Sequence, residues 1–182
     1  DEKKYNTFWP VNFHLIGKDI LTTHSVYWPT MLMSAELPLP KGIFAHGWWL
    51  SDQTKMSKSL GNVVDPLDLI DSYGVDPIRF YLMKEMVLGQ DANFSMDSFI
   101  KCYNSDLAND FGNLLSRVTN LINKFYDGAL EPIFDDSIDG QDVKYAALDS
   151  MELSKNFMND MKINEAINSI FNFVRKVNKY LE

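Results

Sequence analysis

Residues 55–66 read KMSKSLGNVVDP, and they separate two parts of the chain that differ in character. Up to about residue 64 the sequence has short apolar runs interrupted by proline and glycine, whereas residues 65–182 repeat helical patterns. The stretch itself places Lys55 and Lys58 among two serines and a glycine. Two flexible ammonium groups on a small-residue loop can follow an anion whose charge moves during a reaction. The stretch therefore predicts a phosphate-binding loop, although a solvated polar loop without function can have the same residues.

The residues before this loop predict a strand–helix–strand unit. A short apolar run at 13–16, closed by Gly17, is typical of a buried strand, and residues 43–50 read as a second one. Between them Asp19 is a candidate N-cap for a helical pattern, with a kink or restart expected near Pro29. Such a unit closes a parallel sheet, so we expect an α/β fold, with a further short strand at 62–64.

The residues after the loop predict an all-helical bundle. Asp65, Asp76 and Ser95 each precede a helical pattern, and Gly74 and Gly128 each follow one. The pattern that starts at Ser95 continues to residue 125 and predicts one long helix. Residues 129–141 predict an acidic loop, and two further helices are expected at 142–161 and 164–181.

Composition restricts the class of protein. The chain of 182 residues is 46% hydrophobic, 23% charged and 13% aromatic, which excludes disorder over most of its length. No apolar run reaches the roughly 18–20 residues of a membrane span. Cys102 is the only cysteine, so neither an internal disulfide nor a zinc–cysteine site is expected, and a cytoplasmic location is favoured.

Charge is distributed unevenly along the chain. The net charge is −8, with 6 Lys/Arg against 5 Asp/Glu in residues 1–61 and 11 against 20 in residues 62–182. This balance argues against broad, non-specific binding of nucleic acid. It is compatible with a local basic site on an acidic body.

Several stretches resemble the class I aminoacyl-tRNA synthetases, and among these ligases the bacterial methionyl-tRNA synthetase family. Residues 55–59 match that class's KMSKS signature letter for letter. The other matching stretches occur in the family's order and spacing: HLIGKDI (14–20), HSVYWPTML (24–32), HGWW (46–49), GVDPIRFYL (74–82) and NDFGNLLSRV (109–118). The resemblance implies the second half of a Rossmann-type catalytic domain at 1–64, a connecting helical segment at 65–95, and a truncated anticodon-binding bundle at 96–182.

The resemblance also implies an activity in protein biosynthesis. The family joins methionine to ATP, assisted by Mg²⁺, and transfers the methionyl group to tRNA(Met). The resemblance implies that Lys55 and Lys58 are the catalytic residues, which act on the phosphates of ATP. The implied ATP-binding residues are these two lysines with Gly17, Asp19, Gly47, Trp48, Trp49, Met56, Ser57 and Ser59.

The same resemblance assigns the amino-acid and tRNA contacts. Methionine would be held by Ile20, His24 and Trp28, although side chains on an apolar helical face are equally often core residues. Asn113 and Arg117 lie four residues apart, on one helix face, and would read anticodon bases. An ordinary solvated helix face is the alternative for this pair.

Two features of the family are missing from these 182 residues. One is the HIGH-type motif, and the other is the inserted connective domain, which often carries zinc-binding cysteines. We therefore expect the chain to act together with the N-terminal half of the same enzyme, to lack zinc, and to be inactive alone. His14 and His46 are expected to be structural, because no neighbouring cysteine or acid completes a metal site.

Two other functions are compatible with the sequence. The first is a different class I nucleotidyltransferase that shares the lysine loop, against which the helices at 96–182 argue. The second is a non-catalytic helical RNA-binding or interaction fragment, which the missing HIGH-type motif favours. Whether the gene continues upstream into that motif would separate the synthetase from the fragment.

Overall fold

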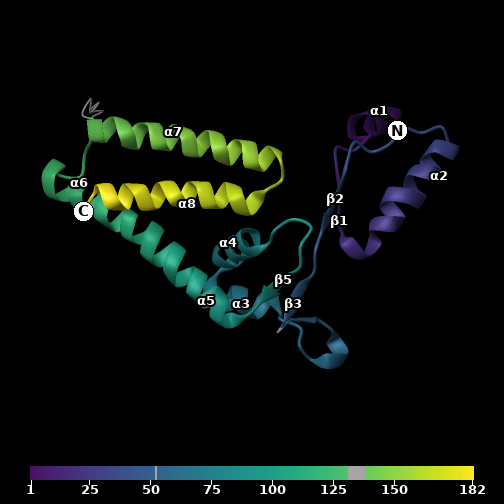
Figure 1. Ribbon diagram of the computed structural model, residues 1–182, viewed down its shortest axis with the longest axis horizontal. Coiled ribbons are helices and arrows are strands. Elements are labelled where there is room, and N and C mark those ends of the chain that lie inside the picture. Colours follow the sequence, from purple (N-terminus) through teal and green to yellow (C-terminus); the bar gives the residue numbers. More distant parts are fainter. Residues whose placement is uncertain (52, 131–137) are drawn as a thin grey trace. The chain divides into compact units, whose positions relative to one another are not determined.

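A computed structural model of the chain describes residues 1–51, 53–130 and 138–182. The described residues form two compact units, Asp1–Asn62 with Leu88–Asn93, and Val63–Val87 with Phe94–Glu182. The model contains helices and small sheets (Figure 1). None of the helices within the described ranges is both long and apolar enough to cross a membrane.

The first unit contains the predicted parallel sheet (Figure 1). After helix α1 (Glu2–Phe8), strand β1 (His14–Gly17) pairs in parallel with strand β2 (Ile43–His46). The chain between them forms a 3₁₀ turn η1 (Lys18–Ile20), a π-helical turn η2 (Thr23–Tyr27) and helix α2 (Trp28–Ser34). This confirms the predicted strand–helix–strand unit, but the second strand predicted at 43–50 is wrong in extent: it ends at His46, and residues 49–51 form β3 of a separate sheet.

Proline and aspartate have different roles in this connection. The π-helical turn η2 changes to helix α2 at Trp28, one residue before Pro29, so the helix changes its pitch at the place where a kink or restart was predicted. The prediction that Asp19 caps a helix is wrong. The cap position of η1 is Gly17, and the Asp19 carboxylate instead accepts a hydrogen bond from Trp48 Nε1 at 3.4 Å. Asp19 thus binds the distant Trp48 side chain in place of the main-chain N–H groups at a helix start.

A second sheet carries the lysine-rich loop. Strand β3 (Trp49–Ser51) pairs antiparallel with β4 (Thr54–Lys55), and β5 (Ala92–Phe94) lies on the other side of β3. Strand β5 falls in the part predicted to be purely helical, and residues 62–64 form no strand, so both details are corrected here. Three residues are too few to show an alternating pattern, and β5 exists because it pairs with a distant strand.

The second unit consists mainly of helices that begin at predicted caps. Helix α3 (Pro66–Tyr73) starts at Asp65, whose side chain accepts a hydrogen bond from Leu67 N at 2.9 Å, and it ends at Gly74. Helix α4 (Val75–Glu85) follows, and Ser95 caps helix α5 (Met96–Cys102). The caps predicted at Asp65, Gly74 and Ser95 are confirmed, while α4 begins one residue before the predicted Asp76.

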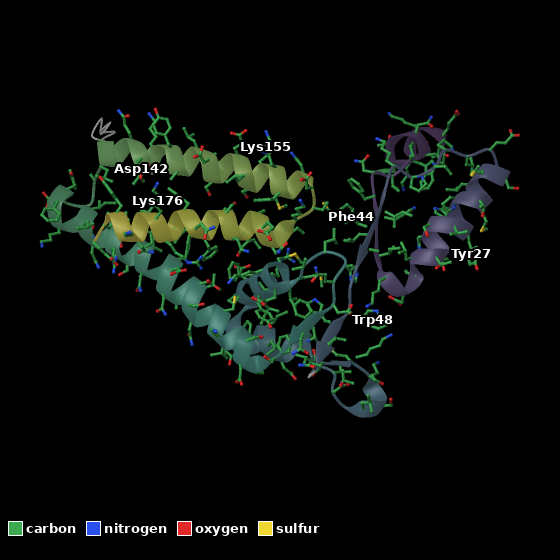
Figure 2. The ribbon with its side chains drawn as sticks, viewed as in Figure 1. Tyr27, Phe44, Trp48, Asp142, Lys155 and Lys176 are labelled. Atoms are coloured by element: carbon green, nitrogen blue, oxygen red, sulfur yellow. The ribbon has the colours of Figure 1, made fainter. Side chains whose placement is uncertain are left out.

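The predicted long helix is present with a change of pitch. Helix α5 continues through a π-helical segment η4 (Tyr103–Gly112) into α6 (Asn113–Tyr126). Helices α7 (Ile138–Asn159) and α8 (Ile163–Tyr180) then form an antiparallel hairpin (Figure 1). Asp142 on α7 and Lys176 on α8 form a salt bridge at 2.8 Å (Figure 2). Of the predicted acidic loop, residues 131–137 lie outside the described residues.

The core of the second unit combines aromatic rings with one buried carboxylate. Tyr81 and Phe99 are almost fully buried and meet edge to face. Asp106 is only 3% exposed and forms salt bridges with Lys84 and Arg175. Burial alone would raise the Asp106 pKa, but hydrogen bonds from Lys84 and Cys102 and the nearby positive charges keep it lowered.

The single cysteine belongs to this core. Cys102 is buried, and its Sγ lies 3.4 Å from an Asp106 oxygen. Burial raises the pKa of the Cys102 thiol to about 12, so the group stays protonated at neutral pH. Cys102 is therefore a buried thiol that donates a hydrogen bond to Asp106.

Candidate functional site

The carboxyl ends of β1 and β2 bring several predicted ATP-binding residues together. The register places Gly17 opposite His46, so Asp19 and the pair Gly47–Trp48 follow at the same edge of the sheet. The indole Nε1 of Trp48 donates to Asp19 Oδ1 at 3.4 Å; Figure 2 labels Trp48. Parallel α/β sheets bind ligands at this edge. The geometry therefore places these residues where a nucleotide site is expected.

Two lysines lie against the Trp48 ring. The Nζ of Lys55 is 4.0 Å and that of Lys18 is 4.3 Å from a Trp48 ring centroid. The Lys18 Nζ also lies 2.7 Å from each carboxylate oxygen of Asp91. Sequence reasoning missed Lys18 and Asp91. Lys18 stands beside Asp19 and could have been singled out, but Asp91 approaches only through the tertiary fold.

Both carboxylates at this edge are ionised at neutral pH. The pKa of Asp19 is lowered by a backbone hydrogen bond, by the Trp48 indole and by the nearby charge of Lys55. The pKa of Asp91 is lowered by hydrogen bonds from Lys18 and from the Trp48 main chain. Their two negative charges offset those of Lys18 and Lys55. Binding of a polyphosphate here therefore needs a further cation.

The lysine-rich loop carries a further cation, Lys58. The loop is held by Asn62, whose Oδ1 accepts from Ser57 N at 2.8 Å and whose Nδ2 donates to Lys55 O at 3.3 Å. The hydroxyls of Ser57 and Ser59 are 2.8 Å apart. Lys58 is exposed, and its side chain forms no salt bridge or hydrogen bond with any residue that the structure describes. Its ammonium group is therefore available for an anion. Asn62 had not been predicted.

Two further predicted ATP-binding residues, Met56 and Trp49, are partly covered by the fold. Met56 is half-buried, and Trp49 is half-buried within β3. The 3₁₀ turn η3 (Lys58–Leu60) ends at Gly61, whose φ of 67° is the left-handed region that favours glycine. The loop thus presents Lys58 from a short turn that is tied at Asn62 on one side.

Gly47 permits the close approach of another segment to this edge. A Cβ at Gly47 would lie 1.9 Å from the Gln90 carbonyl oxygen and 2.7 Å from Asp91 N. At Gly17, by contrast, the nearest atom is the movable carboxylate oxygen of Asp19, at 2.6 Å. Only glycine therefore fits at position 47 without displacing main chain.

We predict that Gly47→Ala destabilises the chain by about 1–3 kcal/mol, the usual cost of overpacking a rigid neighbour. Gly17→Ala is the matched control and is expected to cost less, because a side chain can rotate away. Thermal unfolding of both variants measures the difference. Equal melting temperatures for Gly47→Ala and the unsubstituted protein would contradict the close approach at Gln90.

The predicted methionine-binding residues lie around an aromatic cluster in the first unit. Trp28 Nε1 donates to His14 Nε2 at 3.2 Å, and the Trp28 ring meets Trp9 edge to face at 6.1 Å. The His24 ring lies 5.7 Å from that of His14, and its Nδ1 is 3.0 Å from the Ile20 carbonyl. The structure thus brings His24 and Trp28 together at His14, while the Ile20 side chain is 42% exposed.

The two other histidines have local partners. His14 accepts the Trp28 hydrogen bond, and His46 Nδ1 lies 2.8 Å from the Gly47 carbonyl. Within the described ranges, no three His, Cys, Asp or Glu side chains are grouped so that they could hold a metal ion.

The predicted anticodon-reading pair lines one pocket in the second unit. Asn113 and Arg117 on α6 line a space of about 450 Å³ together with residues of η4 and α8. Arg117 Nη1 donates to the Asn178 carbonyl at 3.2 Å and lies 3.5 Å from Glu182 Oε1. Both predicted side chains are exposed. The structure therefore brings the pair together on one accessible, polar surface.

Comparisons with known proteins identify relatives of the whole chain. Residues 1–119 match the family described as tRNA synthetases class I (M). Methionine–tRNA ligases from Clostridium acetobutylicum and Rickettsia bellii are 46% and 42% identical over 100% and 98% of this chain. The chain spans 28% and 36% of their lengths.

Solved structures show the same relationship. Mycobacterium tuberculosis methionyl-tRNA synthetase in complex with methionyl-adenylate is 36% identical, with a TM-score of 0.93 over 99% of this chain and 35% of that chain. A second structure of that synthetase, also bound by methionyl-adenylate, gives a TM-score of 0.90 at 37% identity over 97% of this chain and 34% of that chain. The class I synthetase fold is thereby confirmed. With the lysine-rich loop at the edge of a parallel α/β unit, these matches establish that the chain belongs to the class I tRNA synthetases of the methionyl type.

Proposed function

We propose that the chain works as part of a methionine–tRNA ligase, in which it binds ATP and the anticodon loop of tRNA(Met). In the reaction, a methionine carboxylate oxygen attacks the α-phosphorus of ATP, which releases pyrophosphate and leaves methionyl-adenylate. A hydroxyl of the terminal adenosine of tRNA then attacks the methionyl carbonyl, loses its proton, and releases AMP. The observation that carries the proposal is the lysine-rich loop, whose Lys55 lies against Trp48 at the carboxyl edge of the parallel sheet and whose Lys58 is exposed. The methionine–tRNA ligase relatives support it.

The ATP site follows from the placement of the loop. Lys58 and Lys55 hold the phosphates and stabilise the negative charge that develops on the leaving pyrophosphate, while Ser57 and Ser59 add donors. Gly17, the last residue of β1, and Asp19, two residues further along, would meet the ribose at the edge where parallel sheets bind ligands. The main chain of Gly47, Trp48 and Trp49 would meet the adenine ring, and the half-buried Met56 is the loop's apolar side chain.

We propose that Mg²⁺ reaches the site bound to the phosphates of ATP. Among the described residues, the carboxylates of Asp19 and Asp91 at this edge are already bound to Trp48 and Lys18. Carboxylates with these partners do not fit a magnesium site made by the protein. Magnesium ordinarily reaches such sites through substrate phosphates, so we propose MgATP as the nucleotide form.

Methionine recognition is proposed at the aromatic cluster. A thioether is apolar and polarisable, and aromatic rings contact it favourably. Trp28 supplies a ring, His24 a polar tip and Ile20 an exposed aliphatic side chain, all within the first unit. Because His14 accepts from the Trp28 indole, it fixes the orientation of that ring.

The helical part is proposed to bind tRNA. We assign residues 1–64 to the second half of a Rossmann-type catalytic domain, 65–95 to a connecting segment and 96–182 to an anticodon-binding bundle. The polar pocket that contains Asn113 and Arg117 supports this, because amide and guanidinium groups recognise the edges of unstacked bases. A cytoplasmic location would fit these partners and the protonated thiol of Cys102.

We predict that Arg117→Ala, in the complete ligase, lowers kcat/KM for tRNA aminoacylation by about 10–100-fold, the usual effect of losing a charged hydrogen-bond donor. Methionine-dependent ATP–pyrophosphate exchange should change little, because tRNA takes no part in it. Lys101→Ala, which removes an exposed cation from α5, is the control. Unchanged aminoacylation in Arg117→Ala would contradict the proposed role of the pocket.

A further inference from the structure

Residues 91–93, which lead into and begin β5, secure the hairpin that carries the lysine loop. Asp91 Oδ1 accepts a hydrogen bond from Trp48 N at 2.8 Å, just before β3 begins. Ala92 N donates to the Trp48 carbonyl at 2.9 Å. Asn93 Oδ1 accepts from Gln53 N at 2.7 Å, in the turn that leads to β4. Residues 91–93 thus contact the hairpin at its start and at its turn.

Asp91 has a second partner that connects it to the cations of the site. Its carboxylate also binds Lys18 Nζ, and Lys18 and Lys55 both lie against the Trp48 ring. One side chain therefore fixes the Trp48 main chain and one of the two ammonium groups on its ring. The Lys18–Asp91 ion pair is partly exposed, so its charge attraction alone contributes little. The ion pair therefore acts mainly by fixing the position of the Lys18 ammonium group.

We propose that Asp91 is a positioning residue for ATP binding, which holds Trp48 and thereby the place where Lys55 rests before it meets the phosphates. The inference depends on the proposed function, since it concerns the same ATP site. The chain of contacts runs from Asp91 to Trp48 by a hydrogen bond and from Trp48 to Lys55 by a cation–π contact. Asp91 itself does not touch the reacting atoms.

The alternative is that Asp91 only stabilises the sheet. The main-chain bond from Ala92 to Trp48 would remain in any Asp91 variant, so the sheet has a support that is independent of this side chain. The side chain adds the contacts to Trp48 N and to Lys18. A positioning role therefore predicts a specific effect on ATP, whereas a purely structural role predicts a lower fraction of folded enzyme.

The test uses Asp91→Ala and Asp91→Asn in the complete ligase, with exchange rates divided by the fraction of active sites. We expect the KM for ATP to rise about tenfold in Asp91→Ala and the KM for methionine to stay within about twofold. Asp91→Asn should be milder, because an amide oxygen can still accept from Trp48 N. Glu36→Gln, which removes an exposed charge from the same unit, should behave like the unsubstituted enzyme.

A double-substitution cycle with Lys55→Ala tests the route of the effect. If Asp91 acts through Lys55, the increase in ATP KM caused by Lys55→Ala should be several-fold smaller in the Asp91→Ala background. An unchanged ATP KM in Asp91→Ala, or strictly additive effects, would overturn the inference. Lys58→Ala in the same assay separates the two claims: if it also leaves exchange intact, the proposed function itself fails.

Discussion

Replacing Lys58 by alanine is expected to slow methionine-dependent ATP–pyrophosphate exchange by about 10²–10³-fold, comparable to the loss of one donor from an oxyanion site. Charge grows on the leaving pyrophosphate as the bond to the α-phosphorus breaks. Lys58 is exposed and has no ion-pair partner within the described part of the chain, so its charge can be directed to those oxygens. The complete ligase, assayed for exchange at saturating methionine, gives the rate.

A control is needed to show that the slower exchange in Lys58→Ala does not arise from unfolding of the enzyme. Because Lys58 is exposed in a surface turn, its removal should leave the melting temperature almost unchanged. Lys58→Arg keeps the charge but changes its shape, so we expect an intermediate rate. An exchange rate in Lys58→Ala equal to that of the unsubstituted enzyme would remove the basis for placing phosphates at this loop.

The second large effect concerns the 182 residues expressed by themselves, which we expect not to form methionyl-adenylate. Within this chain the proposed cations for the phosphates come from one exposed loop, and Ile20 of the proposed methionine site is 42% exposed. A nucleotide held loosely from one side lacks the orientation that can account for about 7–11 kcal/mol of a barrier. The relatives, of which the chain spans 28%, support the expectation that further residues complete the site.

Pyrophosphate exchange on the purified 182-residue polypeptide measures this directly. Circular dichroism provides the control, because a helical spectrum shows that inactivity does not arise from an unfolded chain. Activity that appears only when a separately produced N-terminal half is added would support the proposal. Exchange by the polypeptide alone at a rate near that of a complete ligase would contradict it.

The sequence predicted the ends of helices correctly where a single capping residue determines the end. Asp65 and Ser95 each accept a main-chain hydrogen bond at a helix start, and Gly74 adopts a φ of 83° at a helix end. Such contacts span two or three residues, so the sequence contains them completely. Strand β5 and the role of Asp19 depend instead on partners tens of residues away, and both predictions failed for that reason.

The candidate site was predictable to a similar extent. Gly17, Asp19, Gly47 and Trp48 follow two parallel strands, and their meeting at one edge follows from topology. Asp91 lies after α4 and reaches Trp48 only because β5 pairs with β3, so no pattern around it indicates this role. The same holds for the buried Asp106, whose partners Lys84 and Arg175 come from two other helices.

The most direct test of the central claim measures two reactions in one enzyme. Pyrophosphate exchange and tRNA aminoacylation are compared for Lys58→Ala and Arg117→Ala in the complete ligase. The account predicts that Lys58→Ala loses both reactions, whereas Arg117→Ala loses aminoacylation and keeps exchange, because phosphates and anticodon are bound by different units of the chain. If Arg117→Ala impaired exchange as strongly as Lys58→Ala does, the assignment of the helical part to anticodon reading would be wrong.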